Sequence, residues 1–199
     1  MTFPKTTALD LAPPEPLPGE VAELFAKCQE KLGLVPNVLV AYAHNPDKLR
    51  AFSQMYNTLM LAKSGLTRLE REMIAVAVSS INRCRYCLVA HGAAVRVMSQ
   101  DPALDEALVT NHHHAELSAR ERAIIDFARK LTTDSANITE ADRDALRTHG
   151  FSDAEIWDIA EVAAFFNMSN RLASAIGMVP NPEYHAQGRA QGRTLGRGD

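Results

Sequence analysis

Apolar residues recur every three or four positions along most of this chain, the spacing that gathers them on one face of an α-helix. The first such stripe is formed by Val21, Leu24, Phe25, Cys28 and Leu32. Similar stripes predict a short helix after Pro36, a longer one over residues 46–63, another over 140–148 and a last one that runs to Ile176. No stretch alternates apolar and polar residues between turn signals, as a strand would. The pattern therefore predicts an all-α fold.

Three helix starts are marked by a Ser or Thr followed three residues later by a Glu. In this capping box, each side chain satisfies a backbone N–H that the first helical turn leaves without a partner. The pairs are Thr67 with Glu70, Ser118 with Glu121 and Ser152 with Glu155. The first two boxes lie inside an echoed pattern, Leu-Ser/Thr-x-x-Glu-Arg, at residues 66–71 and 117–122. The echo indicates either two similar caps or a duplicated helical hairpin of which one copy carries chemistry.

The two ends of the chain differ in composition from its centre. Residues 11–18 contain four prolines, which lack a backbone donor and exclude a helix there. Residues after Pro182 carry too few apolar side chains to pack. We therefore predict a Pro-rich N-terminal arm over residues 1–19, a single all-α domain over 20–182 and a flexible tail over 183–199.

Composition and charge exclude several classes of function. The 199 residues carry 21 basic and 24 acidic side chains, a net charge of −3, so no global basic field would attract nucleic acid or an anionic membrane. The N-terminus has no apolar signal region, and no run approaches the roughly 20 apolar residues that span a bilayer. Three cysteines, an odd number, argue against a secreted disulfide framework. We expect a cytoplasmic globular protein whose partners are small molecules or other proteins.

The segment with the most chemical information contains Cys84, Cys87 and His91. Residues separated by three and seven positions share one face of a helix, so both sulfurs and the imidazole would line one stripe. His91 lies one turn beyond Cys87 and is therefore the nearer base for that thiol. The third cysteine, Cys28, continues an apolar stripe, and we expect it to pack in the core.

A fold-back near Asn82 would bring Glu72 to the same place. On one unbroken helix, Glu72 would lie roughly 18 Å from Cys84 and on another face. Asn82 is a poor helix former, and it stands ten residues after Glu72 and nine before His91. A break there would make an antiparallel helical hairpin with arms about 15 and 13.5 Å long. It would also place Cys84 in the first turn of the second helix, where free backbone N–H groups lower a thiol pKa from about 8.5 toward or below 7.

Glu72, Cys84, Cys87 and His91 form the pattern E-x11-C-x2-C-x3-H. This pattern resembles the active-site signature of the alkylhydroperoxidase D-like members of the carboxymuconolactone decarboxylase superfamily. The segments 34–37, 82–92 and 165–171 are similar to the peroxidase-related branch of that superfamily. The resemblance extends over residues 34–182. It implies the alkylhydroperoxidase D-like helical bundle, with the C-x-x-C at the start of a helix in an antiparallel hairpin.

The resemblance implies a thiol-dependent peroxidase that reduces hydrogen or organic peroxides and needs neither a metal nor a flavin. In that family the second cysteine attacks the peroxide and becomes a sulfenic acid, so Cys87 would be the attacking thiol. Cys84 would supply a proton and then close the disulfide, and His91 with Glu72 would form a proton relay. The family also implies a thiol/disulfide protein that donates electrons, and a homo-oligomer, either a trimer or a hexamer.

Other interpretations of the same residues stay open. In a thioredoxin-like interpretation Cys84, nearer the helix N-terminus, would be the nucleophile. Two Cys, one His and one Glu could also hold a zinc ion, although no second C-x-x-C is present, and the cysteines could instead be buried small hydrophobes. At the level of function, one alternative is a carboxymuconolactone decarboxylase-like enzyme, whose members generally lack the C-x-x-C. Another is a non-catalytic redox-sensing or zinc-binding interaction module.

Three further features have both a structural and a functional interpretation. The run His112–His114 falls between predicted helices, and its side chains would diverge on a helix, so we expect an exposed loop rather than a metal site. Asn167, Asn170 and Arg171 interrupt an apolar helix and would make structural hydrogen bonds, line a pocket or contact a neighbouring subunit. Tyr86, between the two cysteines, would either shield the site or pack.

Overall fold

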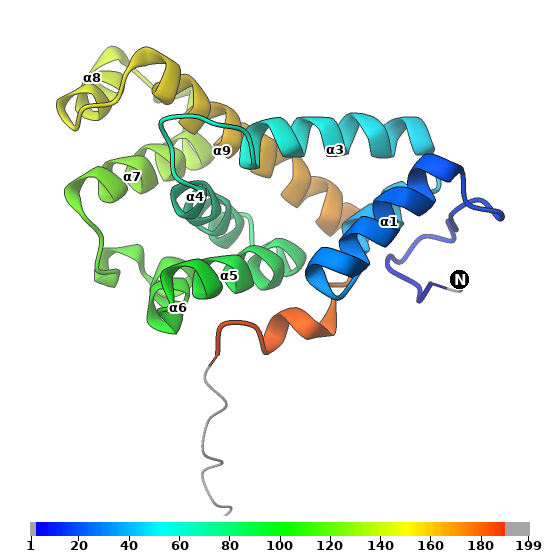
Figure 1. The fold of residues 1–199 in the computed structure, drawn as a ribbon. Coiled ribbons are helices and arrows are strands. Elements are labelled where there is room, and N and C mark those ends of the chain that lie inside the picture. Colours follow the sequence, from blue (N-terminus) through cyan, green and yellow to red (C-terminus); the bar gives the residue numbers. More distant parts are fainter. Residues whose placement is uncertain (1–2, 190–199) are drawn as a thin grey trace, which may run out of the picture.

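The computed structural model describes residues 3–189 of the 199-residue chain and shows a bundle of α-helices with no strand in those residues (Figure 1). The helices are α1 (Gly19–Leu32), α2 (Asn37–Tyr42), α3 (Pro46–Met60), α4 (Arg68–Ile81), α5 (Arg85–Ser99), α6 (Pro102–Thr110), α7 (Ala119–Thr133), α8 (Glu140–Thr148) and α9 (Asp153–Ala175). Short 3-10 helices are η1 (His112–His114), η2 (Ser135–Asn137) and η3 (Pro182–His185). The predicted all-α fold is therefore confirmed. No helix within the described residues is long and apolar enough to cross a bilayer.

The predicted helix starts agree well with the structure. Thr67, Ser118 and Ser152 each accept a hydrogen bond from the backbone N–H of the Glu three residues later, and each Glu carboxylate accepts one from the backbone N–H of the cap residue. Helix α8 also has its predicted bounds. Helix α3 is shorter than predicted and ends at Met60 rather than Lys63. The side chains of residues 61–65 are exposed, so continuing the helix would gain no packing there.

Helix α6 is not predicted by the apolar spacing, although its start carries a local signal. The Asp101 side chain accepts a hydrogen bond of 2.8 Å from the backbone N–H of Ala103. Pro102 occupies the first helical position, where a missing N–H removes no helical hydrogen bond. The Asp-Pro pair therefore marks a helix that is too short to show a clear apolar stripe.

Helix α4 lies at the centre of the bundle, with α5, α6, α7 and α9 packed around it. All residues from Glu70 to Ser79 are buried. Burial on every side explains why apolar residues occupy the whole circumference of this helix rather than one stripe. Ile74 of α4 packs in the same cluster as Ile124 of α7 and Phe166 of α9. The element that carries Glu72 is thus held from all directions.

The N-terminal arm lies along the end of α9. The backbone N–H of Ala8 donates to the carbonyl oxygen of Ile176 at 2.8 Å. The backbone N–H of Val179 donates to the carbonyl oxygen of Thr6 at 2.9 Å. Residues 4–18 contain no helix, as the prolines predict. The arm is therefore extended and joined to the body through its backbone.

The segment after α9 is held in place by α5. The Arg96 guanidinium donates to the carbonyl oxygens of Tyr184 and Gln187, each at 2.9 Å, and also bonds the buried carboxylate of Asp105. Residues 183–189 of the predicted flexible tail are thus bound by side-chain hydrogen bonds, which a count of apolar residues does not anticipate. The rest of that predicted tail lies outside the described residues.

Two copies of the tripeptide Val-Pro-Asn, one before α2 and one after α9, bind each other. Asn181 Oδ1 accepts a hydrogen bond of 2.7 Å from the backbone N–H of Asn37. The two amide groups then donate outward: Asn37 Nδ2 to Val179 O at 2.9 Å, and Asn181 Nδ2 to Val35 O at 3.0 Å. We call this arrangement the V-P-N clasp. It fastens the start of α2 to the segment that follows α9.

Candidate active site

The turn between α4 and α5 brings the predicted site residues together. The N–H of Cys84 donates to Ser79 O at 3.1 Å, and the N–H of Arg83 donates to Ser80 O at 3.3 Å. Arg83 has a φ of 52°, in the left-handed region, which completes the pattern of a Schellman turn. The chain therefore breaks where the sequence predicts, and Cys84 becomes the N-cap residue of α5.

Glu72 and His91 form a direct contact across this hairpin. Glu72 Oε2 lies 2.6 Å from His91 Nδ1, and the two side chains are only 7% and 13% exposed. The ring of Phe166 packs edge-on against the imidazole, with centroids 4.6 Å apart. The contact inferred from the fold-back is therefore present. Because Nδ1 is engaged by the carboxylate, Nε2 is the ring nitrogen left to accept or donate a proton.

The two cysteines are reduced and have opposite pKa shifts. The pKa of Cys84 is lowered to about 6, chiefly because the Cys87 thiol donates a hydrogen bond to it. Backbone N–H groups of Cys87 and Tyr86 and the Ser174 side chain lower it further, while burial opposes them. The pKa of Cys87 is raised, first by the same hydrogen bond and then by burial. The Cys87 thiol thus contributes most to the lowered pKa of Cys84, and the backbone N–H groups at the helix N-terminus contribute in the direction that the sequence predicts.

A polar network that sequence reasoning missed supports the thiol of Cys87. Hydrogen bonds from the side chains of Asn170 and Ser79 favour its ionised form and oppose the rise in its pKa. Asn170 Nδ2 donates to Ser79 Oγ at 2.9 Å, and Asn82 Nδ2 donates to Asn170 Oδ1 at 3.0 Å. Of the interpretations weighed for Asn170, structural hydrogen bonding is the one realised, and its place beside Cys87 is the additional finding. The sequence signal for this network is the amide side chain of Asn170 inside an otherwise apolar helix.

Asn167, Arg171 and Tyr86 have structural contacts as well. Asn167 Oδ1 accepts hydrogen bonds from Asn82 Nδ2 at 3.0 Å and from Arg171 Nη1 at 2.8 Å. Tyr86 is 5% exposed, and its hydroxyl accepts a hydrogen bond of 3.1 Å from the backbone N–H of Val38. Tyr86 therefore packs beside the cysteines and also ties α5 to α2.

A pocket of about 840 Å³ gives access to the site. Its wall includes Glu72, Tyr86, Cys87 and His91. Cys84 is 1% exposed and is not part of this wall. A molecule in the pocket would therefore reach the Cys87 thiol before the Cys84 thiol.

Cys28 also lines this pocket rather than lying in the core. It is half-buried, and partial burial raises its pKa. The prediction of a core cysteine is wrong because the inner face of α1 covers a cavity at this position instead of a packed neighbour.

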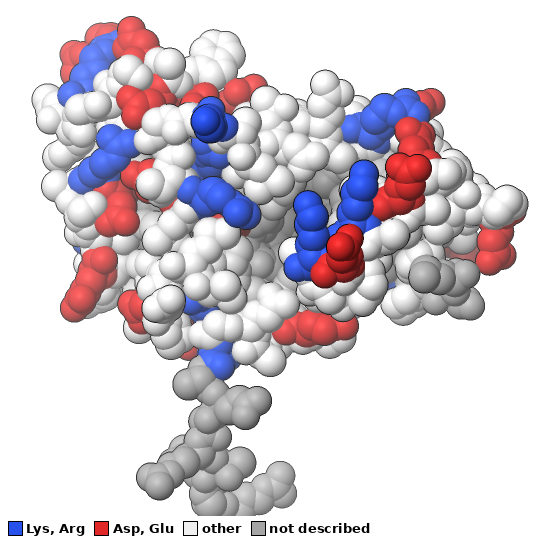
Figure 2. All heavy atoms as spheres, viewed as in Figure 1, with Lys and Arg blue, Asp and Glu red and all other residues white. Residues whose placement is uncertain are grey.

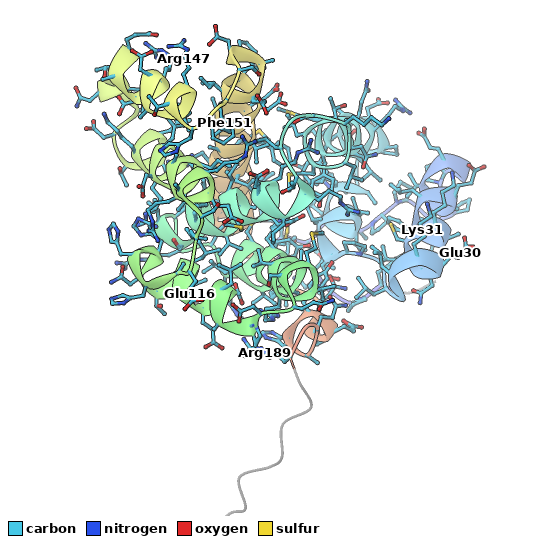
Figure 3. All side chains as sticks on the ribbon, turned by 60° about the vertical axis from the view of Figure 1, so that its left-hand side comes forward. Glu30, Lys31, Glu116, Arg147, Phe151 and Arg189 are labelled. Atoms are coloured by element: carbon cyan, nitrogen blue, oxygen red, sulfur yellow. The ribbon has the colours of Figure 1, made fainter. Side chains whose placement is uncertain are left out.

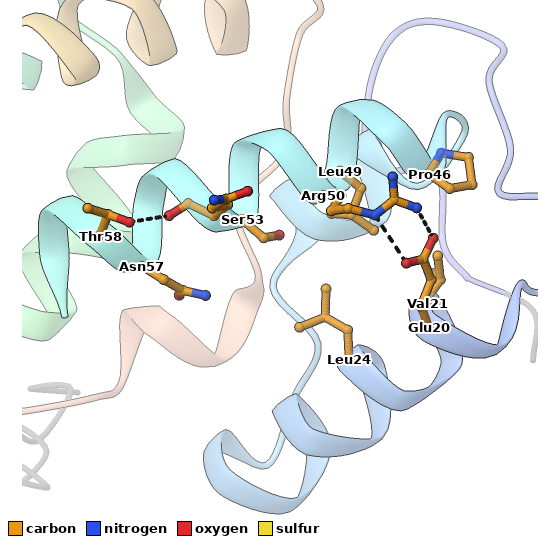
Figure 4. A pocket seen from close by; sticks show the side chains of 10 residues that line it. Glu20, Val21, Leu24, Pro46, Leu49, Arg50, Ser53, Asn57 and Thr58 are labelled. Atoms are coloured by element: carbon orange, nitrogen blue, oxygen red, sulfur yellow. Dashed lines mark hydrogen bonds and ion pairs between the residues drawn. The ribbon is translucent and has the colours of Figure 1, made fainter. Parts of the chain in front are cut away.

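A smaller hollow of about 390 Å³ lies between α1 and α3 (Figure 4). Its charged residues, Glu20 and Arg50, bond each other across the two helices, with Arg50 Nε donating to Glu20 Oε2 at 3.2 Å. Leu24 and Leu49 supply apolar wall. This hollow holds no thiol and no acid–base pair free to react.

The histidine run forms the short helix η1 rather than an open loop. His112 is buried, and its Nε2 lies 3.3 Å from Asp126 Oδ1, so the expectation of full exposure is wrong for this residue. His113 and His114 are exposed. Within residues 3–189, no three His, Cys, Asp or Glu side chains are grouped closely enough to hold a metal ion.

Comparisons with known proteins agree with the fold and the position of the site. A model of the carboxymuconolactone decarboxylase family matches residues 46–103, the segment that contains all four predicted site residues. The chain is 63% identical to an uncharacterized peroxidase-related protein from Silicibacter sp. TM1040, with a TM-score of 0.92 over 95% of this chain and 100% of that chain. It is 43% identical to the alkylhydroperoxidase AhpD core of an uncharacterized peroxidase-related protein from Ralstonia eutropha JMP134, with a TM-score of 0.89 over 95% and 99% of the two chains.

The debrominase Bmp8 has the same fold at 21% identity, with a TM-score of 0.71 over 85% of this chain and 90% of that chain. No curated protein matches the sequence. The all-α bundle, with a bonded Glu and His beside a C-x-x-C pair, is the architecture that this chain shares with the peroxidase-related proteins. The chain belongs to the alkylhydroperoxidase D-like, peroxidase-related branch of the carboxymuconolactone decarboxylase superfamily, a superfamily that includes enzymes.

Proposed function

We propose that this protein is a thiol-dependent peroxidase that reduces hydrogen or organic peroxides through a dithiol/disulfide cycle of Cys87 and Cys84. The observation that carries the proposal is the meeting of Cys87, His91 and Glu72 on the wall of one pocket, with His91 and Glu72 bonded at 2.6 Å. A nucleophile beside an oriented acid–base pair is the arrangement that covalent catalysis requires.

The two cysteines have different roles, because the negative charge is favoured on one sulfur and the pocket gives access to the other. The lowered pKa places the resting thiolate on Cys84, whereas the pocket reaches Cys87. The Cys87 thiol donates its hydrogen bond to Cys84, so one proton is shared by the pair. Transfer of this proton from Cys87 to Cys84 leaves a thiolate on Cys87, and this thiolate is in contact with the pocket.

The first half-reaction breaks the O–O bond of the peroxide. The Cys87 thiolate attacks the terminal oxygen, forms an S–O bond and becomes a sulfenic acid, while the alkoxide leaves and takes the proton held by Cys84. The peroxide gains two electrons, and the sulfur of Cys87 loses them. The products of this step are an alcohol and a new thiolate on Cys84.

The second half-reaction forms the disulfide. The Cys84 thiolate attacks the sulfur of Cys87 and expels hydroxide, which takes a proton from His91 Nε2 and leaves as water. The Glu72 carboxylate holds the ring through Nδ1 and stabilises its charged form before that transfer. A thiol/disulfide donor protein then returns two electrons to the pair; of the two protons taken up with them, one goes to the cysteines and one to His91 Nε2, which restores the reduced site with neither a metal nor a flavin.

We also propose that the protein is cytoplasmic and assembles into a trimer or hexamer. Trp157 and Met168 on one side of α9 are 69% and 49% exposed. Their spacing places them along a single helix face, and an exposed apolar stripe of this kind is typical of a surface that a second copy covers. Analytical ultracentrifugation of the wild-type protein would measure the number of chains in the assembly.

Substitution of Cys87 tests the assigned roles. We expect Cys87→Ser to abolish peroxide consumption in an assay with a general dithiol reductant, because no other thiol on the wall of the site is paired with a resolving cysteine. Cys84→Ser should complete one turnover and accumulate a sulfenic acid, which a dimedone-type probe would detect on Cys87. Cys28→Ser is the matched control and should keep the wild-type rate. Wild-type activity in Cys87→Ser would refute the assignment.

A further inference from the structure

The pocket in front of Cys87 is far larger than a small peroxide requires. One water molecule takes about 30 Å³ in the liquid, and hydrogen peroxide is of similar size. The pocket measures about 840 Å³, which lies within the range of about 300–1,000 Å³ that holds drug-sized ligands. Its volume therefore matches a molecule with a long organic chain.

The wall between the opening and the site is apolar and rigid. Aromatic rings form much of it, contributed by Tyr42, Phe52, Tyr56, Phe165 and Phe166. The rings of Tyr42 and Phe52 stack with centroids 4.4 Å apart, and those of Phe52 and Phe165 with centroids 5.8 Å apart. Rings held against one another lose little freedom when a ligand binds, so this wall is preformed for an apolar chain.

The exposed charged side chains on the pocket wall are all basic. Lys27 and Lys31 of α1 and Arg68 of α4 line the pocket and are exposed. Within the described residues none of these three cations has an ion-pair partner, whereas Glu72, the acid of the wall, is bonded to His91. Figure 2 shows basic side chains over α1 beside a hollow in the surface, with an acidic side chain next to them.

The acidic residues of α1 do not cancel this charge inside the pocket. Glu20, Glu23 and Glu30 lie on α1 but are not part of the pocket wall. Glu20 is bonded to Arg50 on the side of α3. The cations therefore line the pocket, whereas the acidic side chain beside them in Figure 2 is not part of its wall.

Two hydroxyl groups on the wall have no partner. Ser53 Oγ and Ser169 Oγ are buried, and neither makes a hydrogen bond within the described residues. Ser169 stands one helical turn after Phe165 and Phe166, on the same wall. Both oxygen atoms have almost no accessible surface, so the polar contacts of a ligand in the pocket must come from other groups.

We propose that the substrate is a long-chain hydroperoxide with an anionic head group, a fatty-acid hydroperoxide, whose apolar chain fills the aromatic part of the pocket. Its hydroperoxide group reaches Cys87 and its carboxylate lies at Lys27 and Lys31. This inference rests on the proposed peroxidase function and names the substrate class of the same site. The chemical step is the one described above, with the fatty-acid hydroperoxide as the two-electron oxidant and the corresponding hydroxy acid as the product.

The test compares a fatty-acid hydroperoxide with its methyl ester and with tert-butyl hydroperoxide, on the full-length protein. In the wild type we expect the acid to have the lowest KM. The double variant Lys27→Gln with Lys31→Gln should raise the KM for the acid about fivefold, since partly exposed charge pairs are individually weak. The KM for the ester and for tert-butyl hydroperoxide should stay unchanged. Lys48→Gln on α3 removes an exposed charge that is not on the wall, and it should change none of the three values.

A binding measurement separates this inference from the proposed function. Oleate, which has the chain and the carboxylate but no peroxide group, should bind the wild type in a calorimetric titration and bind the double variant about fivefold more weakly. Oleate binding without turnover of any peroxide would support the assignment of the pocket and refute the peroxidase. Turnover of all three peroxides with equal KM values, and no oleate binding, would overturn this inference and leave the peroxidase standing.

Discussion

Helices α4 and α7 start with the same six-residue pattern, and each leads through a turn into a second helix, α5 or α8. Alignment of Leu66 with Leu117 places Ala123 opposite Glu72, Ser135 opposite Cys84, Ile138 opposite Cys87 and Asp142 opposite His91. The first helices of the two hairpins therefore share their capping box and differ by one residue in length, whereas α5 has 15 residues and α8 has 9. Each of the four site residues of the first hairpin is replaced in the second. Local signals set where a helix begins, and they carry no information about the chemistry that follows.

The surroundings of the two hairpins differ as much as their sequences. Helix α4 is enclosed by its neighbours, whereas Leu146 is the one buried residue within α8. Figure 3 shows Arg147 of α8 at one end of the molecule and Lys31 of α1 at another. The turn of the first hairpin is anchored to α9 by Asn82, while Asn137 in the second bonds only its neighbour Asp134. A buried acid–base pair needs this enclosure, because water would otherwise screen it.

The largest expected difference between the hairpins is catalytic. We expect Glu72→Gln to lower kcat for peroxide reduction about a hundredfold, because the amide cannot stabilise the charged ring of His91. Glu121→Gln in the second hairpin is the matched control, since Gln keeps a capping box and the residue is only partly buried. Steady-state peroxide consumption measures both. A Glu72→Gln variant with wild-type kcat would remove the proton relay from the mechanism.

The next difference concerns stability. Glu70 is 5% exposed and bonds both the Thr67 N–H at 2.6 Å and Arg120 Nε at 3.0 Å, whereas Glu121 caps an exposed helix start. We expect Glu70→Ala to lower the free energy of unfolding by about 2 kcal/mol and Glu121→Ala by about 0.5 kcal/mol. Urea unfolding of the two variants measures these values. Equal losses would mean that burial adds nothing to the first cap.

A third difference appears in the dependence of stability on pH. The Cys84 pKa lies at about 6 in the folded protein, below the usual value of 9.0, so the folded state binds fewer protons between these values. The free energy of unfolding of the reduced protein should therefore rise with pH across this window and fall as the pH drops through about 6. Cys84→Ser, which has the residue type of the equivalent Ser135, should remove this rise. An unchanged pH profile would contradict the lowered pKa.

Much of the fold could be predicted from the sequence because it depends on neighbouring residues. Capping boxes and apolar spacing are local, and the hairpin that joins Glu72 to His91 follows from one break at Asn82. The contacts of Asn170 with Ser79 depend on the packing of α9 against α4, which no local pattern encodes. The same holds for the pocket, whose wall comes from helices far apart in the chain, so the local apolar stripe wrongly predicts a core position for Cys28.

The V-P-N clasp has a kinetic consequence for the proposed binding of long molecules in the pocket. Helix α1 and the start of α2 form its outer wall, and the clasp is a latch made of three hydrogen bonds that joins this wall to the segment after α9. Transient release of the latch, together with the hydrogen bond between Val38 and Tyr86, would let the wall move outward and admit a bulky chain, while the reacting groups on α4 and α5 stay fixed in the bundle. Entry and exit of substrate would then be timed by the opening of Asn37 from Asn181, and amide hydrogens of α2 would exchange faster than those of α4.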